Sequence, residues 1–240
     1  MKKVLIALLV AMAVAAVAVT AWLLYATQRY RQLVDLGKQA QQSYESLARE
    51  YTFERPTAET TATAARWEAF LAVRERAIAA IPKSFDQRAP QILAMKRPGL
   101  HGQISFLLDL APELAPVVKA HTEALREARM SPAEYRWMMG VAMLGAVREP
   151  EKYPAGKAYR ALIGQIATFG RRLAENARLP VEPDRIPDAG FVIQTMQKEF
   201  GSYPVAPPEV LEKLTTRESG YLADIFAVAV EPGKEMMNDE

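Results

Sequence analysis

Histidine is the side chain best suited to acid–base work and metal binding near neutral pH, and the chain has only His101 and His121. Two histidines can share a metal when they lie four positions apart on a helix, but these lie 20 positions apart without a carboxylate at ligand spacing. His121 follows Val118 by one helical turn, so we expect a hydrogen-bonded, partly buried side chain. His101 falls in the loop 98–102, where we expect a surface position or the lining of a cleft.

Other reactive groups are scarce. Cysteine is absent, which excludes disulfides, thiolate zinc sites, iron–sulfur clusters and thiol nucleophiles. Met138, Met139 and Met143 could bind Cu(I), but methionine is also an ordinary core residue, and we favour that interpretation. The chain has no G-x-S-x-G motif and no glycine-rich phosphate loop. We therefore predict no catalytic residue, no metal site and no cofactor.

The aromatic residues indicate a candidate binding site more strongly than the ionisable residues do. Tyr135 and Trp137 fall near a predicted helix start, where aromatic side chains serve ligand grooves as well as helix crossings. Together with His101 and His121 they are our candidates for a cleft. An enzyme based on carboxylates is a weaker alternative, for which the candidates are Glu134, Glu149 and Glu151.

These side chains must be positioned by helices. Ser131-Pro132-Ala133-Glu134 combines a capping serine, a proline at the first helical position and a glutamate that can reach back to the cap. The helix that begins there is apolar nearly all round as far as Leu144, so we predict a central buried helix, with Gly140 and Gly145 allowing close approach of neighbours. Since no alternating strand pattern occurs, the predicted fold class is all-α, an irregular bundle of several helices.

The segment Val4–Ala26 is an unbroken run of 23 residues in which Thr20 is the only polar side chain. As a helix it would span about 34 Å, against about 30 Å of hydrocarbon in a bilayer. Lys2 and Lys3 precede it, which is the layout of a single-pass signal anchor. We expect residues 1–28 to anchor the chain and the rest to lie outside the cytoplasm, in a periplasm; a cleaved signal peptide is the alternative.

Four segments are expected after the anchor. Residues 29–60 form an amphipathic stalk helix and linker, whose apolar stripe packs on its own domain or, as the alternative, forms a weak coiled-coil homodimer. Residues 61–178 form the core of the bundle, and residues 232–240 form a disordered tail. Residues 179–231 are rich in proline and wrap that core, and the apolar residues expected to be buried against it are Phe191, Phe200, Leu211, Leu222 and Phe226. Opposite charge favours the wrapping, because residues 179–240 carry 5 Lys and Arg against 12 Asp and Glu, whereas residues 29–178 carry 23 against 16.

The function expected from these features is that of an interaction, scaffold or assembly factor anchored in the cell envelope, without catalysis. Residues 29–240 are neutral overall, with 28 Lys and Arg and 28 Asp and Glu, which argues against nucleic-acid binding. The expected partners are the bilayer, through Val4–Ala26, and another protein. A module that binds an apolar or anionic envelope ligand is the first alternative, and the carboxylate enzyme is the second.

Overall fold

The fold is known from a computed structural model that describes residues 27–32, 34–58, 61–85, 115–177 and 188–229. In these ranges the regular structure is helical and no strand occurs, so the predicted all-α class is confirmed. The described helical segments are residues 27–50 (residue 33 excepted), α2 Ala64–Ala79, residues 83–85, residues 115–127, α5 Pro132–Arg148, α6 Pro154–Ala177, α7 Ala189–Phe200, α8 Pro208–Glu212 and α9 Glu218–Ala229.

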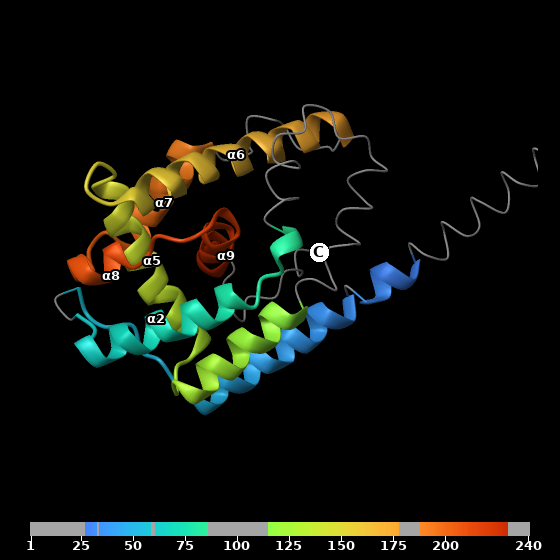
Figure 1. Cartoon of the computed structure of the whole chain (residues 1–240), viewed down its shortest axis with the longest axis horizontal. Coiled ribbons are helices and arrows are strands. Elements are labelled where there is room, and N and C mark those ends of the chain that lie inside the picture. The colour runs from blue at the N-terminus through green and yellow to red at the C-terminus, as the bar shows by residue number, and fades with distance from the viewer. Residues whose placement is uncertain (1–26, 33, 59–60, 86–114, 178–187, 230–240) are drawn as a thin grey trace, which may run out of the picture.

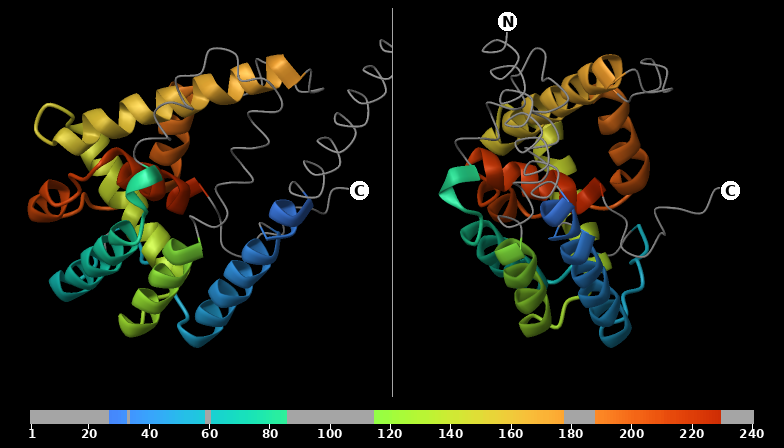
Figure 2. Two further views of the ribbon diagram at one scale, coloured as in Figure 1. Left: turned by 45° about the vertical axis from the view of Figure 1, so that its right-hand side comes forward. Right: turned by 90° about the vertical axis from the view of Figure 1, so that its right-hand side faces the viewer.

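The predicted central helix is α5. Its residues from Tyr135 to Val147 are all buried, and it contacts α2, α6, α7, α8 and α9. Figure 1 shows α6 and α7 along one side of α5, and α2 with the helices 27–50 and 115–127 along the other. The turned views in Figure 2 agree with this arrangement. The prediction of a buried girdle behind Ser131 is confirmed, because a helix enclosed on all sides needs apolar residues on every face.

Two glycines on α5 allow neighbours to approach its backbone. A Cβ atom at Gly140 would collide with the ring of Phe200 from α7. A Cβ atom at Gly145 would lie 3.0 Å from Cγ1 of Val205 and 3.3 Å from Cδ2 of Leu211. The expected close approach at both glycines is therefore confirmed.

The start of α5 is capped as the sequence indicates. The Ser131 hydroxyl accepts a hydrogen bond from the Glu134 amide at 3.0 Å, and Pro132 is the first helical residue. The Glu134 carboxylate accepts instead from Arg66, whose Nε lies 2.8 Å from Oε1, so this glutamate joins α2 to α5. A tertiary ion pair has thus taken the glutamate that was expected to complete the capping box.

Replacing Ser131 with alanine should lower the free energy of unfolding by about 0.5–2 kcal/mol, because an amide of the first turn loses its acceptor. The measurement is the denaturant midpoint of the purified chain. Ser131→Thr is the matched control, since it keeps a hydroxyl and should retain most of the stability. Equal losses in both variants would show that the capping bond contributes little.

The segment from α7 to α9 packs on the helical body. Its buried residues include Met196, Phe200, Val210, Leu211, Leu214, Tyr221 and Leu222. Arg136 of α5 joins the two parts by donating to the Val228 carbonyl at 2.8 Å and to Glu199 Oε1 at 2.7 Å. Arg55 donates to the same Glu199 oxygen at 2.7 Å.

One residue expected to be buried in this segment is exposed. Phe191 is 57% exposed, so the prediction that it would contribute to packing was wrong. The buried face of α7 contains Met196 and Phe200, four positions apart, and Phe191 lies about 140° around the helix from Met196. The side chain of Phe226, also expected to be buried, lies outside the described part of the chain.

The helix 27–50 divides into two halves. In its second half Leu47 is fully buried, and just beyond its end the Tyr51 hydroxyl donates to the Arg126 carbonyl at 3.4 Å. In its first half, none of the described residues from 27 to 43 is buried. The apolar stripe of the stalk therefore packs on its own chain where it is docked, while the homodimer stays a prediction.

The predicted anchor Val4–Ala26, the candidate His101 and the predicted tail 232–240 all lie outside the described residues. Among the helices that are described, none combines the length and the apolar character needed to cross a membrane.

Candidate functional site

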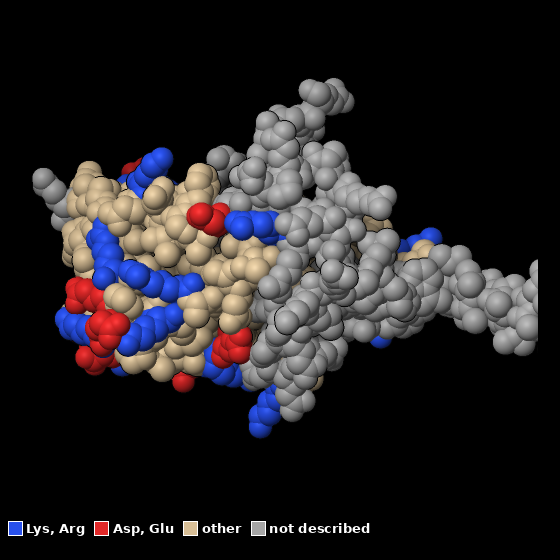
Figure 3. Space-filling model, turned by 90° about the horizontal axis from the view of Figure 1, so that it is seen from above, with Lys and Arg blue, Asp and Glu red and all other residues tan. Residues whose placement is uncertain are grey.

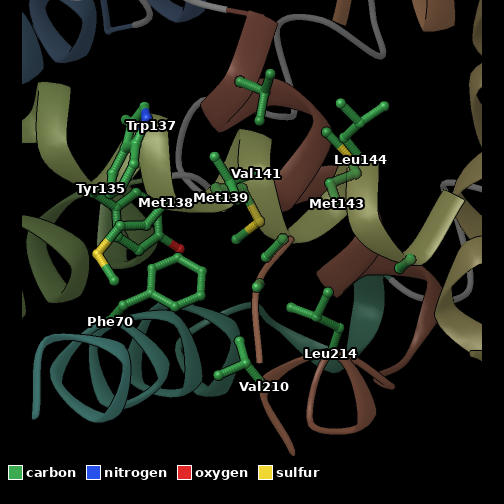
Figure 4. Packing of buried hydrophobic residues seen from close by; sticks show 14 of the residues in the cluster. Phe70, Tyr135, Trp137, Met138, Met139, Val141, Met143, Leu144, Val210 and Leu214 are labelled. Atoms are coloured by element: carbon green, nitrogen blue, oxygen red, sulfur yellow. The ribbon is translucent and has the colours of Figure 1, made fainter. Parts of the chain in front are cut away.

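The structure brings two of the four cleft candidates together. His121 lies on helix 115–127 and Tyr135 lies in the first turn of α5, and their rings meet edge to face with centroids 4.6 Å apart. Tyr44 of helix 27–50 completes the group, with its hydroxyl 2.9 Å from His121 Nδ1. Phe70 of α2 also packs on Tyr135, at 5.2 Å between ring centroids (Figure 4). Four helices thus converge on this aromatic cluster.

Burial sets the protonation states in the cluster. Loss of solvent lowers the pKa of His121 to about 4, because the charged imidazolium is disfavoured. Burial likewise raises the pKa of Tyr44 to about 12 and that of Tyr135 well above its usual value. All three side chains are therefore neutral at pH 7.

A neutral histidine held by a phenol differs from a catalytic base. The hydrogen bond of Nδ1 goes to Tyr44, whereas a general base is usually oriented by a carboxylate. The Nε2 atom is buried and has no hydrogen-bond partner in the described part of the chain. The expectation that His121 is a hydrogen-bonded, partly buried residue is confirmed.

Trp137 belongs to a different surface of α5. Two positions along a helix correspond to a rotation of about 200°, so Trp137 points away from Tyr135. Its ring contacts Phe53 and Tyr203, with centroids 5.8 and 5.5 Å away, and the side chain is 4% exposed. Trp137 is thus part of the packing between α5 and two irregular segments, and it does not join His121.

The three glutamates of the enzyme alternative each have a separate basic partner. Glu134 pairs with Arg66, Glu149 with Lys152 at 3.5 Å, and Glu151 with Lys157 at 2.7 Å. No group of three or more His, Asp or Glu side chains that could hold a metal occurs within the described ranges. Each of these carboxylates is therefore engaged in an ion pair, and the pairs of Glu149 and Glu151 are exposed.

A buried ionic network was missed by the sequence reasoning. It joins Arg74 of α2, Tyr159 of α6 and Asp224 of α9, which are 4%, 0% and 2% exposed. Arg74 Nη2 donates to Asp224 Oδ2 at 2.8 Å, and the Tyr159 hydroxyl donates to the same oxygen at 2.7 Å. Arg74 also donates to the carbonyls of Lys213 and Leu214, at 3.2 and 2.7 Å.

Burial and the ion pair between Arg74 and Asp224 act in opposite directions on the pKa values of the network. Burial works to lower the pKa of Arg74, but the Asp224 carboxylate outweighs it and raises that pKa above the ordinary value. For Asp224, burial raises the pKa above its ordinary value, and the opposing effects of Arg74 and Tyr159 offset that rise only in part. All the donors and acceptors at this network belong to the chain itself, so its chemistry is that of a structural link between α2, α6 and α9.

A signal for this network existed in the sequence. Arg74 lies seven positions after Trp67 and four after Phe70, on the buried stripe of α2, where a charged side chain requires a partner. Asp224 interrupts an apolar run in the same way. Opposite charges on two buried stripes suggest a pair, but 150 positions of chain separate them.

Comparisons with protein-family models, with curated proteins and with solved structures found no match to this chain.

Proposed function

We propose that this chain is a helical domain tethered to a membrane and lying outside the cytoplasm, which acts by binding a protein partner as a scaffold or assembly factor. The observation that supports the proposal is a described helix that directly follows the predicted anchor in the sequence. The apolar run ends at Ala26, and a helix that reaches residue 50 is described from Thr27 onward. This helix is about 36 Å long, so its exposed first half would hold the body away from the bilayer surface.

The polar side chains make contacts within the chain, and this favours a binding role over catalysis. His121, Glu134, Arg74 and Asp224 are all engaged in contacts that join helices of the same chain. Catalytic groups instead need a path to substrate and a pKa matched to their task. The ligand-binding alternative depends on a cleft between the proline-kinked helix predicted over 104–125 and the wrapping segment 179–231, and residues 104–114 and 179–187 of these two segments lie outside the described ranges.

The charge pattern supports a protein partner more than a nucleic acid. Figure 3 shows basic and acidic side chains mixed on one part of the face seen from above, next to an area of uncharged residues. Nucleic-acid binding requires a face of predominantly positive charge. Phe191 and Val205, 57% and 45% exposed, are apolar side chains available for contact.

Carbonate extraction should leave the full-length protein in the membrane pellet, because an apolar helix of this length partitions into the bilayer. A variant that begins at Arg29 is the control and should appear in the supernatant. A reporter that is active only outside the cytoplasm, fused after Glu240, should be active. A soluble, N-terminally processed protein would support the signal-peptide alternative, and a stable but inactive fusion would reverse the topology.

The binding role is tested with a photo-crosslinking residue placed at Phe191 or Val205 of the full-length protein in intact cells. We expect a discrete adduct with one other protein that is lost when unlabelled protein is present in excess. Absence of any saturable adduct from these positions, and from further exposed positions on α6 and α7, would count against a scaffold role.

A further inference from the structure

The docked half of helix 27–50 is held to the body by a small contact that we call the tether joint, made of Tyr44, Leu47, His121 and Tyr135. Leu47 is fully buried, and Tyr44 and Tyr135 contact the His121 ring from two different helices. The outer contacts of the same helix are weaker, because the Glu50–Arg126 pair is 4.0 Å apart and partly exposed. Docking of helix 27–50 therefore depends strongly on the surroundings of His121.

The surroundings of the His121 ring satisfy the hydrogen bonding of its neutral form better than that of its protonated form. One ring nitrogen of a neutral imidazole donates and the other accepts, and the hydrogen bond between Nδ1 and the Tyr44 hydroxyl satisfies either role. Protonation places an N–H on both nitrogens, and Nε2 is buried without an acceptor in the described structure. An unsatisfied buried donor that also carries charge is costly.

No described anion compensates for such a charge. From helix 27–50 the titratable group that faces His121 is Tyr44, and from α5 it is Tyr135, both phenols. On its own helix, Glu123 points to Arg76 of α2 and to Lys119. The buried acid Asp224 is already paired with Arg74.

We propose that the tether joint is an acid-sensitive release, in which protonation of His121 frees helix 27–50 from the body. The docked state then requires a neutral His121, and the released state exposes the imidazole to water and accepts the proton. Release would change how the body is held relative to the point where helix 27–50 begins. The proposal concerns this contact and does not require the proposed partner.

The sign and size of the effect follow from linkage. The pKa of His121 is about 4 when it is docked and takes its ordinary value of about 6.5 when it is released. Docking is thus fully favoured above about pH 6.5 and is progressively lost as the pH falls toward 4. The docked-to-released ratio should fall by up to about tenfold per pH unit, or about 300-fold over the whole interval.

The absence of native cysteine allows a direct test on the full chain. Spin labels are attached to Gln42→Cys on helix 27–50 and Glu75→Cys on α2, both exposed positions. Distance distributions are then recorded by pulsed electron resonance between about pH 7.5 and 4.5. We expect one short distance at neutral pH, and a broad, longer population that grows on acidification.

The matched variant is His121→Gln, which cannot be charged in this range and should abolish the pH response. His121→Phe serves if the glutamine variant fails to fold, and Tyr44→Phe should retain the response because His121 still titrates. A second label pair within the body, Glu75→Cys with Lys152→Cys, should not respond. The proposal is overturned if His121→Gln and His121→Phe show the same pH response as the wild type. It is also overturned if the distance between the two labels within the body and the helical circular dichroism change over the same pH range as the distance from helix 27–50 to α2.

Discussion

Replacing Asp224 with alanine should lower the free energy of unfolding by about 3–5 kcal/mol, because it leaves the Arg74 guanidinium buried without its anion. The variant also removes the acceptor of the Tyr159 hydroxyl, so the loss affects the contacts of α2, α6 and α9 with one another. The measurement is denaturant unfolding followed by circular dichroism. A loss below about 1 kcal/mol, the usual value for an exposed pair, would show that water reaches this site.

A double-mutant cycle separates the pair from its surroundings. Arg74→Met and Asp224→Leu should each be destabilising, whereas the double variant should be less destabilised than the sum of the two. The reason is that each single change leaves one uncompensated charge, and the double change leaves none. Strictly additive losses would indicate that Arg74 acts mainly through the carbonyls of Lys213 and Leu214.

Replacing Phe200 with alanine should cost about 3–5 kcal/mol, since its side chain is 1% exposed and its removal leaves a cavity against α5. Phe191→Ala is a control on the same helix, where the ring is 57% exposed, and should change stability by no more than about 0.5 kcal/mol. The measurement is the denaturant midpoint of each variant. Similar losses in the two variants would mean that α7 buries a different face.

The same site permits a second check. A Cβ atom at Gly140 collides with the Phe200 ring, so Gly140→Ala should destabilise the wild type by about 1–3 kcal/mol. In the Phe200→Ala background the ring is gone, and the added methyl group should cost less or fill part of the cavity. An unchanged cost in that background would place the strain elsewhere.

Local signals in the sequence were sufficient for the helices and for the central one among them. The Ser131 cap, Pro132 and the apolar girdle concern neighbouring turns of one helix, and all three appear as expected. The predicted charge complement also agrees with the observed pairs, since Arg55, Arg74 and Arg136 from residues 29–178 meet Glu199 and Asp224 from residues 179–240. The predicted burial of Phe191 was wrong because an apolar residue that lies one position along the sequence from the apolar stripe of a helix is easily assigned to that stripe.

Composition and spacing alone therefore determined the all-helical class, the start of α5, its buried core and the long apolar run before residue 27. Only the tertiary structure decided that His121 meets Tyr44 and Tyr135, that Trp137 does not join them, and that Arg74 meets Asp224. The physical reason is the separation along the sequence of the residues that make each contact. Caps and stripes depend on residues three or four positions apart, whereas these contacts depend on how helices separated by up to 150 positions cross one another.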